Sequence, residues 1–284
     1  MPAGGRPTVR SRRLGSALRQ YRQAAKIDQP QAAELIASSQ ARISRVESGH
    51  ATPRVIEVRL LLEAYGVSDE EVRLKLEELA RQPKKRGWWS EHAPHLRPKY
   101  VDHIALEDDA TTIRQWQQVL VPGLLQIPAY SETVVVGGPN RLSREHIERL
   151  LEVRKRRQER ITKGGVMFRA VIWEAVIRHP LVDAQIHCDQ LAALLEVGQR
   201  ENVTLQVLPF SAGTLPAATP AFAAFSFDTD SRVEVVAMDD LTSAPVIDSS
   251  DDLDSYYRVF EQLQTSALTT EQSAELIQST LKAL

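Results

Sequence analysis

Five neighbouring residues have side chains that could contact the edges of DNA bases: Gln40, Ala41, Arg42, Ser44 and Arg45. In the major groove, Gln bonds adenine with two hydrogen bonds, Arg does the same with guanine, and Ala can touch a thymine methyl. Ile43 and Val46 have the spacing of a buried helix face, so the polar residues would share the opposite face of one short helix. The composition of this helix therefore indicates a surface that reads base edges.

Residues 26–49 must position that helix, and they predict two short helices joined by a tight turn. Asp28 is a helix-capping residue with Gln31 at nearly the spacing of a capping box, and Pro30 falls in the first turn, where a missing N–H costs little. The apolar face of this first helix consists of Ala32, Leu35 and Ile36.

The second helix is expected over about 40–48. Ala37 to Ser39 forms the turn, Ser39 caps the second helix, and Gly49 is placed to end it in a left-handed conformation.

Over about residues 10–75 the chain resembles the xenobiotic-response-element (XRE) type of helix-turn-helix regulator, a class that includes phage repressors. The residues that carry the resemblance are Leu14-Gly15, Leu18-Arg19, Arg22, Gln29, Ala32-Ala33, Gln40, Ile43-Ser44-Arg45, Glu47, Gly49 and Thr52-Pro53. The family usually has Gly where this chain has Ala37, and a positive φ there would strain Ala by about 1 kcal/mol. A generic helical hairpin with a polar face is the alternative interpretation.

The resemblance implies a role for several residues. Gln40, Ala41, Ser44 and Arg45 occupy base-facing positions. Arg22 and Glu47 would form an ion pair between the first helix and the recognition helix, with more value for orientation than for stability. Phosphate contacts are implied for Gln29, Ser39 and Thr52, and four further arginines are generic phosphate candidates: Arg54 and the arm residues Arg10, Arg12 and Arg13.

The charge is uneven along the chain. Residues 1–90 contain 17 Lys and Arg against 10 Asp and Glu, whereas the remainder contains 18 against 27. A basic N-terminal part followed by an acidic remainder suits DNA binding confined to one end of the chain. A charged run can also be only a solvated surface.

The length of 284 residues suggests about two domains. We expect a multidomain protein with an all-α helix-turn-helix N-terminal domain of about five helices and an α+β C-terminal domain. The segments are a disordered or basic arm at 1–10, the DNA-binding domain at 11–81, a linker at 82–87 and the second domain at 88–284.

Within the first domain, further helices are predicted at 11–26, 54–65 and 68–81. Four residues are expected to close its core: Leu60, Leu61, Ala64 and Tyr65.

The second domain mixes the two kinds of periodicity. Helices are predicted at 102–119, 129–136, 143–162, 183–200, 251–266 and 270–281. Strands are predicted at 166–171, 203–208, 221–227 and 232–237.

A second resemblance rests on the Val121-Pro122-Gly123-Leu124-Leu125-Gln126 segment. The chain is similar over about 88–280 to actinobacterial XRE regulators that carry a PGLLQ signature and a C-terminal domain of unknown function, often called antitoxin-like. The other matching residues are Trp88, Leu106-Glu107, Tyr130, Arg154, Arg157-Gln158, Trp173-Glu174-Ala175, Gln190-Leu191 and Gln206-Val207-Leu208-Pro209. This resemblance implies a regulator, often encoded beside a small acidic protein that could be its partner.

Apolar residues of the second domain could line a site for a ligand or a partner: Trp88, Trp116, Leu124, Leu125, Tyr130 and Trp173. Apolar loop residues after a Pro-Gly turn can line a cavity. Core filling is the alternative, and we favour it for the two leucines.

Other kinds of site have weaker support. His92-x-x-His95 has ligand spacing and His187-Cys188-Asp189 could add to it, but no CxxC or HExxH motif accompanies them, so no metal is expected. No nucleophile motif or glycine-rich phosphate loop is present, so we expect neither an enzyme nor a cofactor. The single cysteine excludes an intrachain disulfide, and no membrane span or secretory signal is apparent, which fits the cytoplasm.

Together these patterns predict a sequence-specific DNA-binding transcriptional regulator that acts as a homodimer on a palindromic site in double-stranded DNA. Its second domain would dimerise and sense a small-molecule effector or a partner. The alternative is an antitoxin-like interaction protein that holds a small acidic partner and regulates its own promoter.

Overall fold

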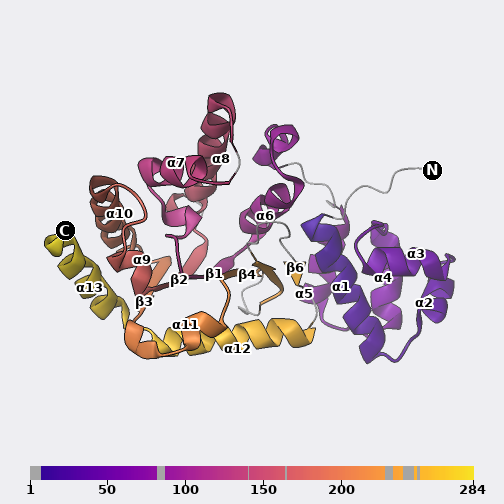
Figure 1. Cartoon of the computed structure of the whole chain (residues 1–284). Coiled ribbons are helices and arrows are strands. Elements are labelled where there is room, and N and C mark those ends of the chain that lie inside the picture. Colours follow the sequence, from indigo (N-terminus) through magenta and orange to yellow (C-terminus); the bar gives the residue numbers. More distant parts are fainter. Residues whose placement is uncertain are drawn as a thin grey trace. The chain divides into compact units, whose positions relative to one another are not determined.

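The computed structural model describes residues 8–81, 87–139, 141–163, 165–227, 233–238, 246–247 and 250–284. The chain divides into two compact units, Met1–Trp88 and Trp89–Leu284, each with its own core. Residues 1–7 of the expected arm and residues 82–86 of the expected linker lie outside the described residues. The fold class is as expected: an all-α first domain is followed by a second domain with a mixed sheet and helices (Figure 1).

The described residues of the first domain form five α-helices, and all of them were expected. They are α1 (Val9–Ala24), α2 (Gln29–Leu35), α3 (Gln40–Glu47), α4 (Val55–Ala64) and α5 (Glu70–Arg81). Thr8 caps α1 by accepting a hydrogen bond from Ser11 N at 3.1 Å, so the helix begins two residues earlier than expected. Arg10 therefore lies in α1 and not in the arm expected over 1–10, whereas Arg12 and Arg13 lie in the helix expected from residue 11.

The core of the first domain corrects three expectations from the sequence. Leu35, Leu60 and Ala64 were expected inside but are exposed. The buried apolar stripe of α4 follows the helical period instead: it consists of Val58, Leu61 and Leu62, and the C-cap residue Tyr65 continues it. In α2 the buried residues are Ala32 and Ala33.

Two glycines allow α1 to pass close to the end of α3. A Cβ on Gly15 would lie 2.3 Å from the carbonyl oxygen of Val46. Gly49 has a φ of +76°, and a Cβ there would lie 2.9 Å from Arg12 N. Both sites exclude larger residues, so these glycines fix the approach of α1 to α3.

The second domain is built on one mixed sheet with the strand order β3-β2-β1-β4-β5-β6. The strands are β1 (Thr112–Gln117), β2 (Met167–Trp173), β3 (Val203–Leu208), β4 (Phe222–Ser226), β5 (Val235–Met238) and β6 (Val246–Ile247). β1, β2 and β3 are parallel, whereas β4 pairs antiparallel with β1 and with β5.

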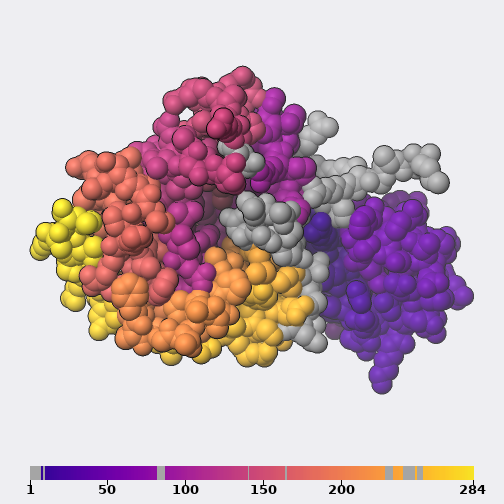
Figure 2. Space-filling model, viewed as in Figure 1, coloured from indigo at the N-terminus to yellow at the C-terminus, as the bar shows by residue number. Residues whose placement is uncertain are grey.

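Helices cover the sheet on both sides (Figure 1). The α-helices of this domain are α6 (Pro98–Asp109), α7 (Pro128–Val136), α8 (Arg144–Thr162), α9 (Glu174–Arg178), α10 (Ala184–Val197), α11 (Leu215–Ala218), α12 (Ser250–Ser266) and α13 (Thr270–Ala283). Short 3-10 helices are η1 (Trp88–Ser90), η2 (Ala93–His95), η3 (Gly123–Leu125) and η4 (Phe210–Ala212). In Figure 2, α7 and α8 lie at one edge of this domain and α12 at the opposite edge.

A hydrophobic cluster joins α12 to one face of the sheet. Trp116, Val171 and Phe222 come from three neighbouring strands, and Phe260 and Leu263 come from α12. Trp116 lies opposite Val171 in the parallel register and opposite Phe222 in the antiparallel one, so the tryptophan lies at the centre of this cluster.

The helix expected over 102–119 is present only as far as Asp109, and its second half is wrong. α6 ends at Asp109, and β1 begins at Thr112 in the middle of the sheet. Ile113 and Trp116 are three residues apart, a spacing that fits a helix face, but the pairing of β1 with strands on both sides decides its conformation. Every other expected helix and strand is present, with ends displaced by a few residues. None of the described helices is long and apolar enough to cross a membrane.

Candidate nucleic-acid interface

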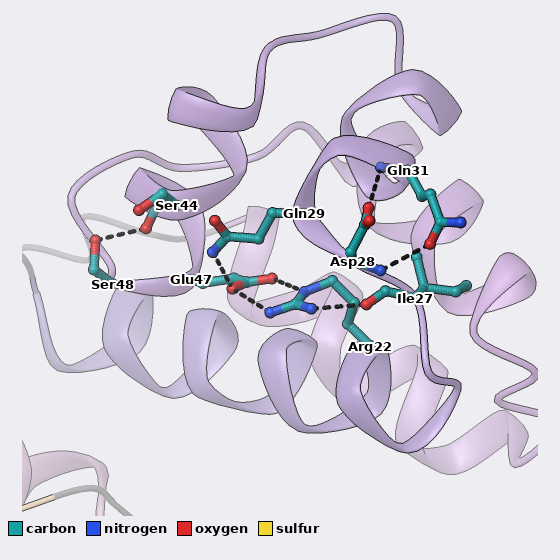
Figure 3. A network of polar contacts seen from close by, with 8 residues as sticks. All are labelled: Arg22, Ile27, Asp28, Gln29, Gln31, Ser44, Glu47 and Ser48. Carbon is teal, nitrogen blue, oxygen red and sulfur yellow. Dashed lines mark hydrogen bonds and ion pairs between the residues drawn. The ribbon is translucent and has the colours of Figure 1, made fainter.

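The start of α2 is fixed by a reciprocal capping box. Asp28 Oδ1 accepts from Gln31 N at 2.8 Å, and Gln31 Oε1 accepts from Asp28 N at 2.9 Å (Figure 3). Pro30 lies in the first turn, where its lack of an N–H leaves no helical bond unmade. The capping predicted from the sequence is confirmed.

The turn between α2 and α3 contains the one expected point of strain. Ala37 has a φ of +48°, the left-handed conformation in which Ala is strained by about 1 kcal/mol. Ser39 then caps α3, with its Oγ accepting from Arg42 N at 3.3 Å. Gly49 ends the motif with a positive φ, as expected.

α3 has a buried apolar side and an exposed outer side. Ile43 and Val46 are buried in the core of the domain. Four of the five candidate base-contacting residues are exposed: Gln40, Ala41, Ser44 and Arg45. At the end of the helix, Ser48 Oγ donates to the carbonyl oxygen of Ser44 at 2.8 Å (Figure 3). The exposed face therefore presents an amide, a hydroxyl and a guanidinium from a rigid element.

Arg22 of α1 and Glu47 of α3 form the ion pair that the resemblance implies. Arg22 Nε lies 2.5 Å from Glu47 Oε1, and Nη2 lies 3.1 Å from Oε2 (Figure 3). The hydrogen bond to Glu47 raises the pKa of Arg22 above its ordinary value. Arg22 Nη1 also donates to the carbonyl oxygen of Ile27 at 2.7 Å.

Gln29, expected at a phosphate, has an additional contact inside the domain. Its Nε2 donates to Glu47 Oε2 at 2.9 Å (Figure 3). The first residue of α2 is thereby connected to the last residue of α3, and the amide helps to fix the angle between the two helices.

Arg42 is the one candidate base-contacting residue that is not fully exposed. Its Nη2 donates to Glu57 Oε2 at 2.9 Å. Glu57 also accepts from Arg54, which caps α4: the backbone N donates at 2.7 Å, Nε at 3.2 Å and Nη2 at 3.1 Å.

Glu57, which is buried between these two arginines, was not among the residues expected in the site. Burial alone would raise the pKa of its carboxyl group, but the hydrogen bonds from Arg54 and Arg42 lower it below the ordinary value. A signal was present, because Glu57 follows the N-cap residue Arg54 by three positions, which is capping-box spacing.

The remaining phosphate candidates lie on three elements. Ser39 is exposed at the start of α3, and Thr52 is half-buried in the loop before α4. The side chain of Arg54 is 77% exposed. Three arginines are half-buried on α1: Arg10, Arg12 and Arg13.

The structure does not bring the candidate apolar site of the second domain together. Trp116 is fully buried under α12, and its Nε1 donates to the carbonyl oxygen of Thr219 at 2.8 Å. Trp173 packs against the same cluster, which contains none of Leu124, Leu125 and Tyr130. Trp88 falls in the first unit.

Leu124 and Leu125 are buried in η3, where buried side chains hold the backbone around them. Gln190 Nε2 donates to the carbonyl oxygen of Leu125 at 2.9 Å, and Gln190 Oε1 accepts from Ile127 N at 2.8 Å. Gln126 Nε2 donates to the carbonyl oxygen of Val121 at 2.8 Å. The PGLLQ segment is thus a closed, hydrogen-bonded turn, which favours the core-filling interpretation of the two leucines.

A buried ion pair joins α6 to α8 in the same domain. Arg157 Nε and Nη2 each lie 2.6 Å from an oxygen of Glu107, and Tyr100 accepts from Arg157 Nη1 at 2.6 Å. Burial alone would raise the pKa of Glu107, but Arg157 and His103 lower it to about 2.

The histidines considered as metal ligands have other neighbours. His92 lies 3.5 Å from Glu91, and buried His187 donates from Nε2 to the carbonyl oxygen of Ile177 at 2.8 Å. Within the described ranges, no three His, Cys, Asp or Glu side chains are grouped so that they could hold a metal ion.

Comparison with protein families agrees with this division of the chain. Residues 100–279, well over half of the chain, match the family described as "Domain of unknown function (DUF5753)". The chain belongs to this family. The DUF5753 match extends from α6 to α13 and so includes the sheet and the PGLLQ turn.

Residues 13–74 of this DUF5753 protein match a family described as "Helix-turn-helix domain", which extends from α1 into α5. Searches of curated proteins and of solved structures gave no match. The helix-turn-helix match suggests DNA as a binding partner.

Proposed function

We propose that this DUF5753 protein is a sequence-specific DNA-binding transcriptional regulator of the XRE type that acts in the cytoplasm. One observation carries the proposal. The exposed side of α3 presents Gln40, Ser44 and Arg45, while Ile43 and Val46 anchor the other side in the core. A capped, buried helix with a polar outer face is what insertion into a major groove requires.

In this mechanism α3 lies in the major groove. Gln40 bonds adenine, Arg45 bonds guanine, and Ala41 lies against a thymine methyl. Phosphate contacts from Ser39, Thr52 and the arginines of the basic first domain set the register without reading sequence. The positive excess of this domain steers it to DNA.

The protein works in this proposal as a homodimer on a palindromic operator, because one short helix reads too few base pairs for specificity. The DUF5753 domain supplies the dimer contact and responds to a small-molecule effector or a protein partner. Two half-sites held by one dimer would raise the affinity above that of a single first domain.

Selection from a pool of random-sequence duplexes tests the proposal. The full-length protein should enrich a two-fold symmetric sequence over successive rounds at fixed salt. The double variant Gln40→Ala with Arg45→Ala serves as the matched control, since it keeps the phosphate-contacting residues but should enrich no sequence. Absence of enrichment by the wild-type protein would refute sequence-specific binding.

A further inference from the structure

Glu57 holds two arginines that come from different parts of the helix-turn-helix domain. Arg42 lies in the first turn of α3, and Arg54 is the N-cap residue of α4. One carboxylate accepts hydrogen bonds from both guanidinium groups and from the backbone N–H of Arg54, at distances of 2.7 to 3.2 Å. Glu57 thereby connects the start of the recognition helix to the start of α4.

The charges of this group do not cancel. Two guanidinium groups around one carboxylate leave an excess of one positive charge. The carboxylate is the buried member, with 6% of its side chain exposed, whereas the side chain of Arg42 is 31% exposed and that of Arg54 is 77% exposed. The negative charge is therefore shielded, and the positive charge lies toward solvent.

Both arginines keep donors for a further acceptor. A guanidinium group has five N–H donors. In its contacts with Glu57, Arg42 uses one side-chain nitrogen and Arg54 uses two. The remaining N–H groups can bond the oxygens of a phosphate while the carboxylate holds the planes of the two groups in place.

We propose that Glu57 is a positioning residue that holds Arg42 and Arg54 as a clamp for the DNA phosphate backbone beside the recognition helix. The inference rests on the DNA-binding function proposed above. It moves Arg42 from the base-reading set to the backbone-contacting set and gives a buried acid a role in binding a polyanion.

Positioning and simple electrostatics predict opposite effects when Glu57 loses its charge. Removing a negative charge near DNA should strengthen binding if repulsion were the main effect. If the carboxylate instead orders both arginines, its loss frees two long side chains, which then give up their phosphate contacts because ordering them there costs conformational entropy. The sign of the change in affinity therefore separates the two accounts.

The experiment measures binding of the full chain to a mixed-sequence duplex over a range of salt concentrations. Glu57→Gln should weaken binding about fivefold to tenfold and reduce the slope of log K against log salt by about 1 to 2, because each phosphate contact contributes about 0.9. Glu63→Gln on the exposed side of the same helix is the matched control, and we expect its affinity to equal or slightly exceed that of the wild-type protein.

The salt slope also separates positioning from a loss of folding. A variant that is partly unfolded binds with a smaller active fraction but with an unchanged slope. Glu57→Asp keeps the charge and shortens the reach by one methylene, so it should weaken binding where electrostatics alone predicts no change. In a background with Arg42→Ala and Arg54→Ala, Glu57→Gln should cause no further loss.

Arg42→Ala gives a test that does not depend on the folding of Glu57 variants. It should weaken binding to a selected operator and to a scrambled duplex by the same factor. Equal or tighter binding by Glu57→Gln, an unchanged slope, or a larger loss on the operator for Arg42→Ala would each overturn the clamp. If the wild-type protein binds no duplex at all, the proposed DNA-binding function fails, and the clamp with it.

Discussion

Arg22 and Glu47 form a buried, bidentate ion pair that joins the first helix of the DNA-binding domain to the end of α3. Their side chains are 10% and 6% exposed. Gln29 of α2 donates to the same carboxylate, so one acid connects all three helices of the motif. The orientation of the recognition helix therefore depends on a group that makes no base contact in the mechanism proposed here.

Replacing Glu47 by Gln should destabilise the first domain. The change leaves the buried Arg22 without its counter-charge, and breaking a buried pair in this way costs about 3 to 5 kcal/mol. Hydrogen exchange of the amides in α1, α2 and α3 measures the loss. Glu34→Gln, on the exposed side of α2, should change the protection by less than about 0.5 kcal/mol. Equal protection in the two variants would contradict a stabilising pair.

Ala37→Gly should stabilise the first domain. Glycine adopts the observed φ of +48° without strain, which gains about 1 kcal/mol, and part of this gain is lost to the greater freedom of glycine in the unfolded chain. The net increase in the free energy of unfolding should be about 0.5 kcal/mol in urea titrations. Ala24→Gly at the end of α1 should act in the opposite direction, since Ala24 is helical. A destabilised Ala37→Gly variant would contradict the assignment of strain.

The pair of Glu107 and Arg157 should make the second domain sensitive to acid. The pKa of Glu107 falls from its ordinary value of 4.5 to about 2 on folding, so the unfolded chain binds more protons between these two values. The contribution of this pair to the free energy of unfolding is fully present above pH 4.5 and is lost as the pH falls toward 2. The loss is on the order of 3 kcal/mol.

Unfolding monitored by tryptophan fluorescence, to which buried Trp116 contributes, measures this effect. Glu107→Gln lowers stability at neutral pH, because Arg157 loses its counter-charge, but it should flatten the dependence on pH in the acid range. If stability depends on pH with the same slope in the variant and in the wild-type protein, folding does not lower the pKa of Glu107.

A fragment of residues 1–88 should fold by itself, because the first unit has its own core. It should bind a selected operator at least tenfold more weakly than the full chain, because the avidity of a dimer is lost with the second domain. Sedimentation and titration of the two proteins on the same duplex check the oligomeric state and the affinity together. Equal affinity would contradict dimerisation through the second domain.

Local chemistry made the helix-turn-helix motif predictable. Asp28 with Gln31, Ser39 and Gly49 act within three residues of their own positions, so their roles could be deduced from spacing alone. The ion pair of Arg22 with Glu47 joins distant parts of the chain, and only the family resemblance indicated it.

Roles that depend on packing between elements were not predictable in this way. Glu57 has the spacing of a local cap, but its contact with Arg42 joins residues 15 positions apart, and only the folded domain brings them together. Thr112 to Gln117 carries apolar residues at positions that suit either a helix or a strand, and the pairing with β2 and β4 selects the strand. Leu35 of α2 and Leu60 and Ala64 of α4 were expected inside for a similar reason. The sequence shows which residues of a helix are apolar, but the neighbouring helices decide which of them are covered.

The most direct test of the account is the base preference of Arg45→Ala on the selected operator. We predict a loss of about 1 to 3 kcal/mol on that operator and a relaxed preference at one base position in each half-site. Arg19→Ala, which removes the same charge from an exposed position on α1, should keep the full preference. If Arg45→Ala binds the operator as tightly as the wild-type protein, or loses affinity without any change in base preference, α3 does not read DNA in the way proposed here.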